Sequence, residues 1–361
     1  MPVSNQTPIV SANFGTSSVS VLYFDPTGSF KVFSFPYSYS HSIFKNSVSE
    51  ADFNLEVIKL ACKSFKVSLK DCDLVATAFP NFPVIDTEIK LSTTLDQVLS
   101  SITDYNCIYA GYFKVLENSG FTYTFPISEQ TNSSENDATN LFGNLSIYPQ
   151  ITFFDDKKKF AIYNMAKMQR SQNRATLDSA KPVLFTGYSL QNFSGKNQYL
   201  SYILCIDLIK EVGCFEIKLD EANILTNLAA INMYKAGNTN VLDDRKLVSL
   251  GTLLNTPGYT ECYVEGDTGT SQLITLEKEK LFFLPLEEGA TAKIVVKNAV
   301  LGNLEKNIKG GRLGLILDTR EKNDPQFTSQ DYFEKNSTLW LSNIKEAMDG
   351  LYVYTSNKEN N

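Results

Sequence analysis

Residues 8–24 read PIVSANFGTSSVSVLYF, two apolar runs separated by the small-residue stretch Gly15-Thr16-Ser17-Ser18. Both runs have the length and the content of valine, isoleucine and phenylalanine that are typical of β-strands. A third run, Phe30 to Tyr37, follows the segment Asp25-Pro26-Thr27-Gly28, whose proline and glycine positions fit a type I turn. The sequence therefore begins with a predicted antiparallel meander of three strands.

A helix and a buried strand are predicted to follow this meander. Val57, Ala61 and Phe65 recur at helical spacing within residues 49–67, so one wide face of the predicted helix is apolar. Residues 74–79 read LVATAF and have the composition of a buried strand. The order of three strands, a helix and a strand favours an α/β fold, in which the crossover helix packs against the sheet.

The rest of the chain is predicted to contain more strands than helices. The segment Glu265-Gly266-Asp267-Thr268-Gly269 is a strong hairpin turn between two of these strands. Helices are expected over residues 221–235 and 337–351. Strands are expected over residues 107–116, 121–125, 183–187, 199–208, 214–219, 259–264, 271–276, 280–284, 292–300 and 313–317.

The composition excludes several classes of function. Of the 361 residues, 43% are hydrophobic, enough for a packed core, and a single histidine is present, His41. Histidine-dependent serine or cysteine catalysis would have to use His41, which lies in a polar stretch and is expected to be exposed. A metal site with several histidines is excluded. The formal net charge is −7 and five residues are arginines, which argues against a nucleic-acid binder.

The cysteines and the N-terminal residues indicate the cellular compartment in which the protein is expected to work. The six cysteines include no Cys-x-x-Cys pair, and most lie in apolar runs, where cysteine acts as a small core residue. This use of cysteine suggests a reducing compartment. The first seven residues lack the basic and apolar regions of a signal peptide, and no apolar run approaches the length of about 18 residues that a membrane span needs. We therefore expect a cytoplasmic protein without a membrane span.

The segment from Asn13 to Ser18 has the clearest potential for binding. A small-residue turn between two strands exposes consecutive backbone N–H groups, which can hold phosphate oxygens together with the hydroxyls of Thr16, Ser17 and Ser18. The same segment is also compatible with an ordinary hairpin loop. The pattern alone leaves both interpretations open.

The place of this loop in the meander resembles the actin-like ATPase superfamily, in which two ribonuclease-H-like halves enclose a nucleotide. The first phosphate loop of that superfamily has the form D-x-G-[ST]-x-[ST], and Asn13-x-Gly15-Thr16-x-Ser18 is similar to it except at the first residue. There the family uses aspartate to hold water on magnesium, and a neutral asparagine cannot contribute this charge. The resemblance implies ATP with Mg²⁺ as the ligand, with slow or absent hydrolysis, and leaves the metal ligands unassigned.

Two further segments resemble the glutamate-mutase-associated MutL family of that superfamily. Residues 310–320, GGRLGLILDTR, look like its closing G-G-x-x-G-x-x-x-D-x-R signature, and Thr186-Gly187 resembles the start of its T-G-G adenosine loop, with tyrosine in place of the second glycine. A second phosphate loop is best placed at Ala110-Gly111-Tyr112, which lacks the expected acidic residue. A glycine turn that leads into a buried strand, with a local ion pair between Asp318 and Arg320, explains residues 310–320 equally well.

The resemblance implies a division of the chain into four parts. Residues 1–103 are expected to form a first ribonuclease-H-like half and residues 104–255 a second, degenerate half. Residues 256–322 are expected to form a β-rich module, and residues 323–361 a C-terminal helix and tail. The expected fold class is thus α/β, with two actin-like halves and an added C-terminal module.

The implied function is that of a nucleotide-binding accessory or assembly protein, at most a weak ATPase, that works with protein partners. Asn13, Gly15, Thr16, Ser17 and Ser18 would hold the phosphates, and Thr186 and Gly187 would lie beside the adenosine. One alternative is a degenerate actin-like scaffold of the pilus-assembly or division type, which binds protein and no nucleotide. Another is a β-rich interaction module without a cleft.

Overall fold

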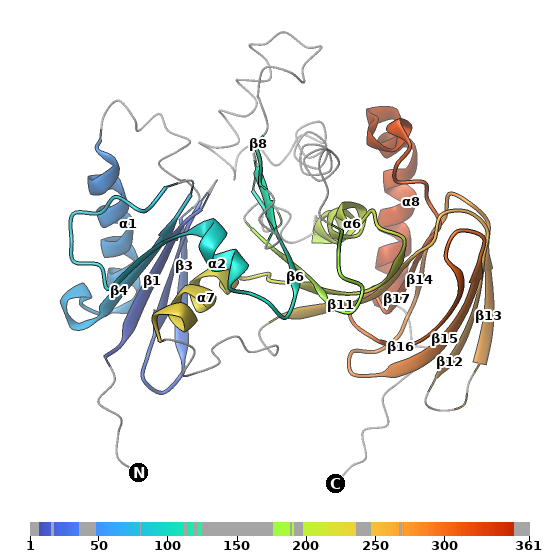
Figure 1. Ribbon diagram of the computed structural model, residues 1–361, viewed down its shortest axis with the longest axis horizontal. Helices are drawn as coiled ribbons and strands as arrows, with labels where there is room; N and C mark the ends of the chain where they lie inside the picture. Colours follow the sequence, from blue (N-terminus) through green and yellow to red (C-terminus); the bar gives the residue numbers. More distant parts are fainter. Residues whose placement is uncertain are drawn as a thin grey trace.

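The structure is a computed structural model that describes residues 7–15, 18–35, 48–79, 81–111, 114–117, 122–124, 176–187, 190, 198–235, 247–266, 269 and 271–349. In these ranges the chain is a mixed α/β protein whose strands form three sheets (Figure 1). The predicted segments around His41, Thr16, Ser17, Tyr112 and Tyr188 lie outside the described residues.

The first sheet is built from the N-terminal segment. Its strands are β1 (Ile9–Phe14), β2 (Val19–Phe24), β3 (Phe30–Phe35), β4 (Asp73–Ala78) and β5 (Leu91–Thr94), in the order β3-β2-β1-β4-β5. The first three strands form the predicted antiparallel meander, and β4 and β5 run parallel to β1. The helix α1 (Glu50–Phe65) covers one face of the sheet with its predicted apolar side. A 3₁₀ turn, η3 (Leu69–Asp71), leads from α1 into β4.

The second sheet repeats this arrangement and extends it. Its described strands are β6 (Asn106–Ala110), β7 (Lys114–Glu117), β8 (Thr122–Thr124), β9 (Val183–Thr186), β10 (Gly213–Leu219), β11 (Val248–Asn255), β14 (Leu281–Leu284) and β17 (Leu315–Asp318). β6, β7 and β8 form an antiparallel meander, β9 is parallel to β6, and β10 is parallel to β9. The order β8-β7-β6-β9-β10 therefore has the same connectivity and the same strand directions as the whole first sheet.

A third, four-stranded sheet packs on the far end of the second. Its strands are β12 (Thr260–Gly266), β13 (Ser271–Leu276), β15 (Thr291–Asn298) and β16 (Gly302–Lys309), in the antiparallel order β13-β12-β15-β16. Its inner face shares an apolar core with Leu254, Leu284, Leu315 and Leu317 of the second sheet. Residues 256–322 thus supply strands to two sheets.

The helices other than α1 divide between two layers. α2 (Leu95–Ser100) and α7 (Leu225–Tyr234) lie between the first two sheets (Figure 1), whereas α6 (Gln198–Leu208) and α8 (Gln330–Asp349) cover the other face of the second sheet. A short 3₁₀ helix, η8 (Pro325–Thr328), precedes α8. Although α7 follows β10 of the second sheet, it contacts β1, β2 and β4 of the first. The chain therefore returns to its N-terminal segment before it completes the second sheet.

Several sequence predictions were wrong. Residues 199–208 form the helix α6 rather than a strand, because this segment is apolar and buried on every side and so lacks a helical period. The predicted strand over residues 107–116 is two strands, β6 and β7, which completes the second meander. The strands β11 and β16 were not predicted. In β16 the outward residues are polar, and Ile308 is its buried apolar residue.

The cysteines behave as expected for core residues. All six are free thiols, and Cys62, Cys107, Cys205, Cys214 and Cys262 are buried. Among the described helices, none combines the length and the apolar character needed to cross a membrane.

The C-terminal glycine signature has a structural role. A Cβ atom built on Gly310 would collide with the backbone of Leu286 and Glu287, and one on Gly311 with the backbone around Leu250. Gly314 has φ +69°, and its backbone lies against that of Leu284. These glycines allow the segment that enters β17 to pass between neighbouring backbones, where side chains would not fit.

A buried ion cluster follows this signature. The Arg320 guanidinium donates from Nε to Asp318 (2.8 Å) and from Nη2 to Asp207 of α6 (2.6 Å), and all three side chains are fully buried. Lys322 Nζ lies 2.8 Å from the second Asp318 oxygen. Burial alone would raise the pKa of Asp318, but the charges of Arg320 and Lys322 lower it below its ordinary value. The predicted local ion pair is thus part of a network that links β17 to α6.

Aromatic rings complete the environment of Arg320. Its guanidinium carbon lies 4.7 Å from the centre of the Trp340 ring in α8 and 5.2 Å from that of Phe327. A desolvated guanidinium is attracted to such ring faces. Arg320 therefore also fixes the position of the last helix.

Replacing Arg320 should be costly. Arg320→Met would leave the buried carboxylates of Asp207 and Asp318 without their main counter-charge, so we expect the free energy of unfolding to fall by about 3–5 kcal/mol. Chemical denaturation measures this change. The matched control is Lys293→Met, because Lys293 forms an exposed pair with Glu305 and its loss should leave the unfolding midpoint almost unchanged. Equal effects of the two variants would contradict the role given to the cluster.

Candidate functional site

The predicted phosphate loop begins where β1 ends. Phe14 is the last residue of β1, and the Gly15 N–H donates to the carbonyl oxygen of Ser18 (2.9 Å), which closes the turn before β2. Asn13 and Ser18 are almost fully buried. The structure thus places the described members of the loop at the carboxyl end of β1, as the sequence predicts.

The side chains of β1 that face α7 are polar near this loop. Asn13 Nδ2 donates to Thr226 Oγ1 (2.6 Å), and Ser11 Oγ donates to Asn227 Oδ1 (2.9 Å). Asn227 Nδ2 in turn donates to Ser20 Oγ of β2 (2.7 Å). The first turn of α7 is therefore held to the first sheet by hydrogen bonds between buried side chains.

Two buried polar atoms remain next to these contacts. In the described part of the chain, Asn13 Oδ1 and Thr77 Oγ1 have no hydrogen-bond partner, and both residues are 1% exposed. They are neighbours in the register of β1 with β4, so their side chains lie on the same face of the sheet. Buried polar atoms normally find a partner. This end of the first sheet therefore has capacity for hydrogen bonds to a ligand or to water.

The second predicted segment lies at the end of β9. Thr186 is fully buried, and its hydroxyl donates to Asp220 Oδ2 (2.8 Å). Gly187 has φ +113°, and a Cβ atom there would collide with the backbone of Ala110 at the end of β6. Gly187 is thus packed against Ala110, the last residue of β6 and the first residue of the segment in which the sequence analysis places a second phosphate loop.

Asp220 joins this segment to α7. Its carboxylate accepts hydrogen bonds from the backbone N–H groups of Ile224 (3.1 Å) and Leu225 (2.8 Å) at the start of α7, in addition to the Thr186 hydroxyl. Burial raises the pKa of Asp220, although these hydrogen bonds oppose the shift. One buried carboxylate therefore connects the end of β9 to the helix that holds Asn13.

The predicted residues come together around β6 and α7. A Cβ atom on Gly15 would collide with the hydroxyl of Tyr109 in β6, and Gly187 lies against the next residue, Ala110. Asn13 and Thr186 both reach the first turn of α7, directly or through Asp220. The structure thus gathers Asn13, Gly15, Thr186 and Gly187, which come from both sheets, into one region.

Sequence reasoning missed the residues that connect this region. Asp220 lies just before α7, and Thr226 and Asn227 lie in its first turn; all three are buried polar residues beside a largely apolar helix. Polar residues in a buried helix are the signal that could have drawn attention to them, because such groups need partners. The chain supplies amides, hydroxyls and backbone N–H groups here. Within the described ranges, no cluster of three or more histidine, cysteine, aspartate or glutamate residues could hold a metal ion.

A partly exposed arginine lies near Asp220. Arg312 Nη1 donates to the Tyr202 hydroxyl (2.8 Å) and to Glu221, the residue after Asp220. Gln198 donates to the same carboxylate. Burial raises the pKa of Tyr202 to about 12. The third residue of the glycine signature thereby connects residues 310–320 to the loop before α7.

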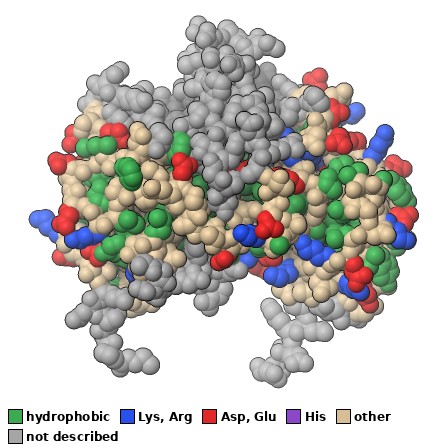
Figure 2. All heavy atoms as spheres, in the orientation of Figure 1, with side chains coloured by type: hydrophobic (Ala, Val, Ile, Leu, Met, Phe, Trp, Pro, Cys, Tyr) green, Lys and Arg blue, Asp and Glu red, His purple; other side chains and the backbone are tan. Residues whose placement is uncertain are grey.

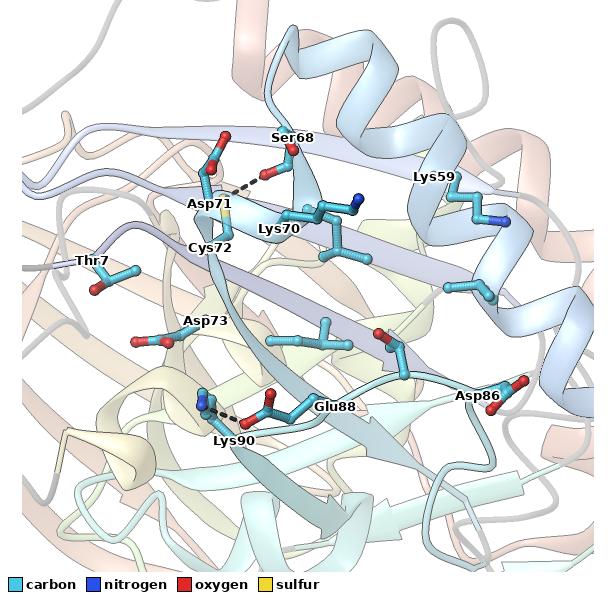
Figure 3. A pocket seen from close by; sticks show the side chains of 14 residues that line it. Thr7, Lys59, Ser68, Lys70, Asp71, Cys72, Asp73, Asp86, Glu88 and Lys90 are labelled. Carbon is cyan, nitrogen blue, oxygen red and sulfur yellow. Dashed lines mark hydrogen bonds and ion pairs between the residues drawn. The ribbon is translucent and has the colours of Figure 1, made fainter.

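A cavity of about 770 Å³ lies elsewhere (Figure 3). It is lined by the start of β4, including Cys72 and Asp73, and by the segment around Asp86 and Glu88. Thr77 and the predicted phosphate loop lie at the other end of the same strands. This cavity is therefore separate from the candidate site.

Comparisons with known proteins give distant structural similarities. No protein-family model matches the sequence, and no curated protein matches it. The chain is similar to the activator of the 2-hydroxyisocaproyl-CoA dehydratase from Clostridium difficile with bound ADPNP, with 11% identity and a TM-score of 0.38 over 64% of this chain and 96% of that chain.

Two further solved structures are similar to the same degree. One is (R)-2-hydroxyglutaryl-CoA dehydratase component A from Acidaminococcus fermentans, with 11% identity and a TM-score of 0.37 over 65% of this chain and 100% of that chain. The other is the ethanolamine utilization protein EutJ from Carboxydothermus hydrogenoformans, with 11% identity and a TM-score of 0.35 over 64% of this chain and 91% of that chain. Similarities of this size do not indicate a function for this chain.

The role of Asp220 can be tested through stability. Asp220→Ala would remove the acceptor for two helix N–H groups and for the buried Thr186 hydroxyl, so the free energy of unfolding should fall by about 2–3 kcal/mol. Urea denaturation measures this loss. Asp86→Ala is the matched control, because Asp86 is exposed and its removal should change the free energy of unfolding by less than about 0.5 kcal/mol. A loss for Asp86→Ala as large as that for Asp220→Ala would show that the cap is not the important contact.

Proposed function

We propose that this chain is an actin-like protein that binds a nucleotide between two ribonuclease-H-like halves. The observation that carries the proposal is the repeated strand order of the two sheets, together with the position of the loops. The Gly15 loop follows the first strand of the first sheet, and the connection after Ala110 follows the first strand of the repeat. Asn13, before the Gly15 loop, bonds to the first turn of α7, and the end of β9 reaches the same turn through Asp220 and lies against Ala110 through Gly187.

In the proposed complex, the backbone N–H groups and hydroxyls of the loop from Gly15 to Ser18 hold the phosphates of ATP. Small residues allow the backbone to approach the phosphate oxygens closely. Thr186 and Gly187 lie on the adenosine side. The unused Asn13 Oδ1 and Thr77 Oγ1 atoms are available to ligand-bound water. ATP would bring Mg²⁺ with it, and the ion would be held mainly by phosphate and water oxygens.

Slow or absent hydrolysis is part of the proposal. Asn13 is neutral, and its amide nitrogen already donates a hydrogen bond to Thr226 Oγ1 (2.6 Å). The residue therefore offers one amide oxygen where the family's aspartate offers a full negative charge to the magnesium-bound water. Binding depends on the loop backbone and is less affected by this difference. We accordingly propose an accessory or assembly role with a protein partner.

A scaffold that binds protein and no nucleotide is the second candidate. The close approach of Gly15 to the Tyr109 hydroxyl favours it, because this contact places a side chain of the second sheet against the loop. The two candidates differ in whether the loop must accept phosphate.

Nucleotide-dependent stabilisation tests the proposal. With millimolar ATP and Mg²⁺, the melting temperature of the full chain should rise by several degrees, since ligand at 100 times its Kd adds about 2.7 kcal/mol of stability. Differential scanning calorimetry measures the shift. The absence of a shift would remove the binding proposal and favour the scaffold.

Two substitutions at Gly15 distinguish the effect of an added negative charge from the effect of an added side chain. Gly15→Asp and Gly15→Asn add side chains of nearly equal size, so both disturb the contact with Tyr109 to the same extent. Only Gly15→Asp adds a negative charge beside the phosphates. We expect Gly15→Asp to lower the affinity for Mg-ATP at least about tenfold relative to Gly15→Asn, a difference of roughly 1.4 kcal/mol. Isothermal titration measures both affinities, and equal values would exclude phosphate binding by this loop.

A further inference from the structure

The third sheet ends in a strand that lacks the usual protection. β13 pairs with β12, and no described strand pairs with its other side. Its sequence, Ser271-Gln272-Leu273-Ile274-Thr275-Leu276, contains no charged residue and no proline. Proteins normally protect exposed edges with such residues, because the unpaired backbone groups of an edge strand can pair with another chain. β13 therefore presents an open, uncharged edge at one end of the molecule (Figure 1).

The opposite edge of the same sheet differs in this respect. β16 carries Glu305, Lys306 and Lys309. Lys306 Nζ donates to the carbonyl oxygen of Cys214 (3.0 Å), and Lys309 forms a pair with Glu216. Both contacts tie this edge to β10 of the second sheet. Of the two edges, β13 is the one suited to a new strand.

An apolar row on the outer face leads to this edge. Leu273 lies opposite Tyr263 in β12, and Tyr263 lies opposite Val295 in β15. Leu273 is 64% exposed and Tyr263 is 40% exposed. Hydrophobic side chains also gather over this end of the molecule in Figure 2. The row ends at Leu273, the residue in the middle of the open strand.

We propose that β13 pairs with β13 of a second copy of this chain and forms a continuous eight-stranded antiparallel sheet. A two-fold axis perpendicular to the sheet keeps the outer face of each copy on the same side, so residues with outward side chains must oppose one another. The pairing that centres on Leu273 places it opposite Leu273 of the second copy. The apolar row then continues from Val295 of one copy to Val295 of the other.

The charges on the outer face are compatible with this register. Ser271 would lie opposite Thr275 of the second copy, a favourable pair across a sheet. Glu277, the residue after β13, would lie opposite Gly269 of the second copy. Glu265 and Glu261 are one strand away from the seam, and each lies opposite a lysine of β15. No like charges face one another across the seam. The edge is therefore complementary to itself in backbone, shape and charge.

Sedimentation velocity on the full chain tests this pairing. Over a hundred-fold range of concentration, the wild type should show a reversible dimer with a Kd on the order of micromolar, as for a small interface. Leu273→Lys places two like charges opposite each other on the two-fold axis and should raise the Kd at least about tenfold. Val300→Lys, which adds the same charge in place of an equally exposed apolar side chain (63%) between β15 and β16, is the matched control and should leave the Kd unchanged.

A mixture of charge variants provides the decisive outcome. At a concentration near the wild-type Kd, Leu273→Lys and Leu273→Glu should each be mainly monomeric, and their equimolar mixture should form a heterodimer, because opposite charges then meet at the axis. Circular dichroism confirms that both exposed-site variants keep the fold. A wild type that stays monomeric, a dimer that Leu273→Lys does not weaken, or a mixture that does not associate would each overturn the proposal. None of these outcomes depends on nucleotide binding.

Discussion

The contact between the first turn of α7 and the first strand holds the two large sheets in one structure. Asn13 and Ser11 of β1 bind Thr226 and Asn227 through buried hydrogen bonds, and the apolar side of α7 fills the core between the sheets. Because these groups are buried, each contact must be satisfied in full or the structure loses stability. This contact also positions the two segments of the candidate site, the Gly15 loop and the end of β9, since Asp220 ties the end of β9 to the same helix turn.

The candidate site and the C-terminal core use polar groups in opposite ways. Around Asn13 the side chains are small, neutral amides and hydroxyls, and two of their atoms remain unused by the described residues. Around Arg320 the groups are charged and fully buried, and they form ion pairs with one another beside aromatic rings, although Arg320 Nη1 has no hydrogen-bond partner among the described residues. The second arrangement fixes one geometry, which suits a structural element. The first leaves hydrogen-bonding capacity at the end of a sheet, which suits the binding of a polar ligand.

Local signals in the sequence predicted much of the fold, and long-range pairing explains what was missed. The turn at residues 25–28 and the hairpin at residues 265–269 located β2 and β13 correctly, because turn chemistry acts over a few residues. The segment over residues 199–208 was misassigned as a strand, because burial on every side removes the period that distinguishes a helix from a strand. The predicted site residues lie close together, but their connection through Thr226 and Asp220 depends on the folded chain. No local pattern encodes the pairing of Asn13 with a residue 213 positions away.

The return of α7 to the first sheet also sets the order in which the chain can fold during synthesis. One face of that sheet, which includes Ile9, Leu22 and Val75, is covered by a core to which α7 contributes. Residues 225–234 leave the ribosome long after residues 9–78, so this face stays incomplete while most of the chain is made. A contact of such high sequence separation slows folding and leaves apolar surface exposed to other chains in the meantime. The nascent protein therefore exposes this apolar face until residues 225–234 have been made.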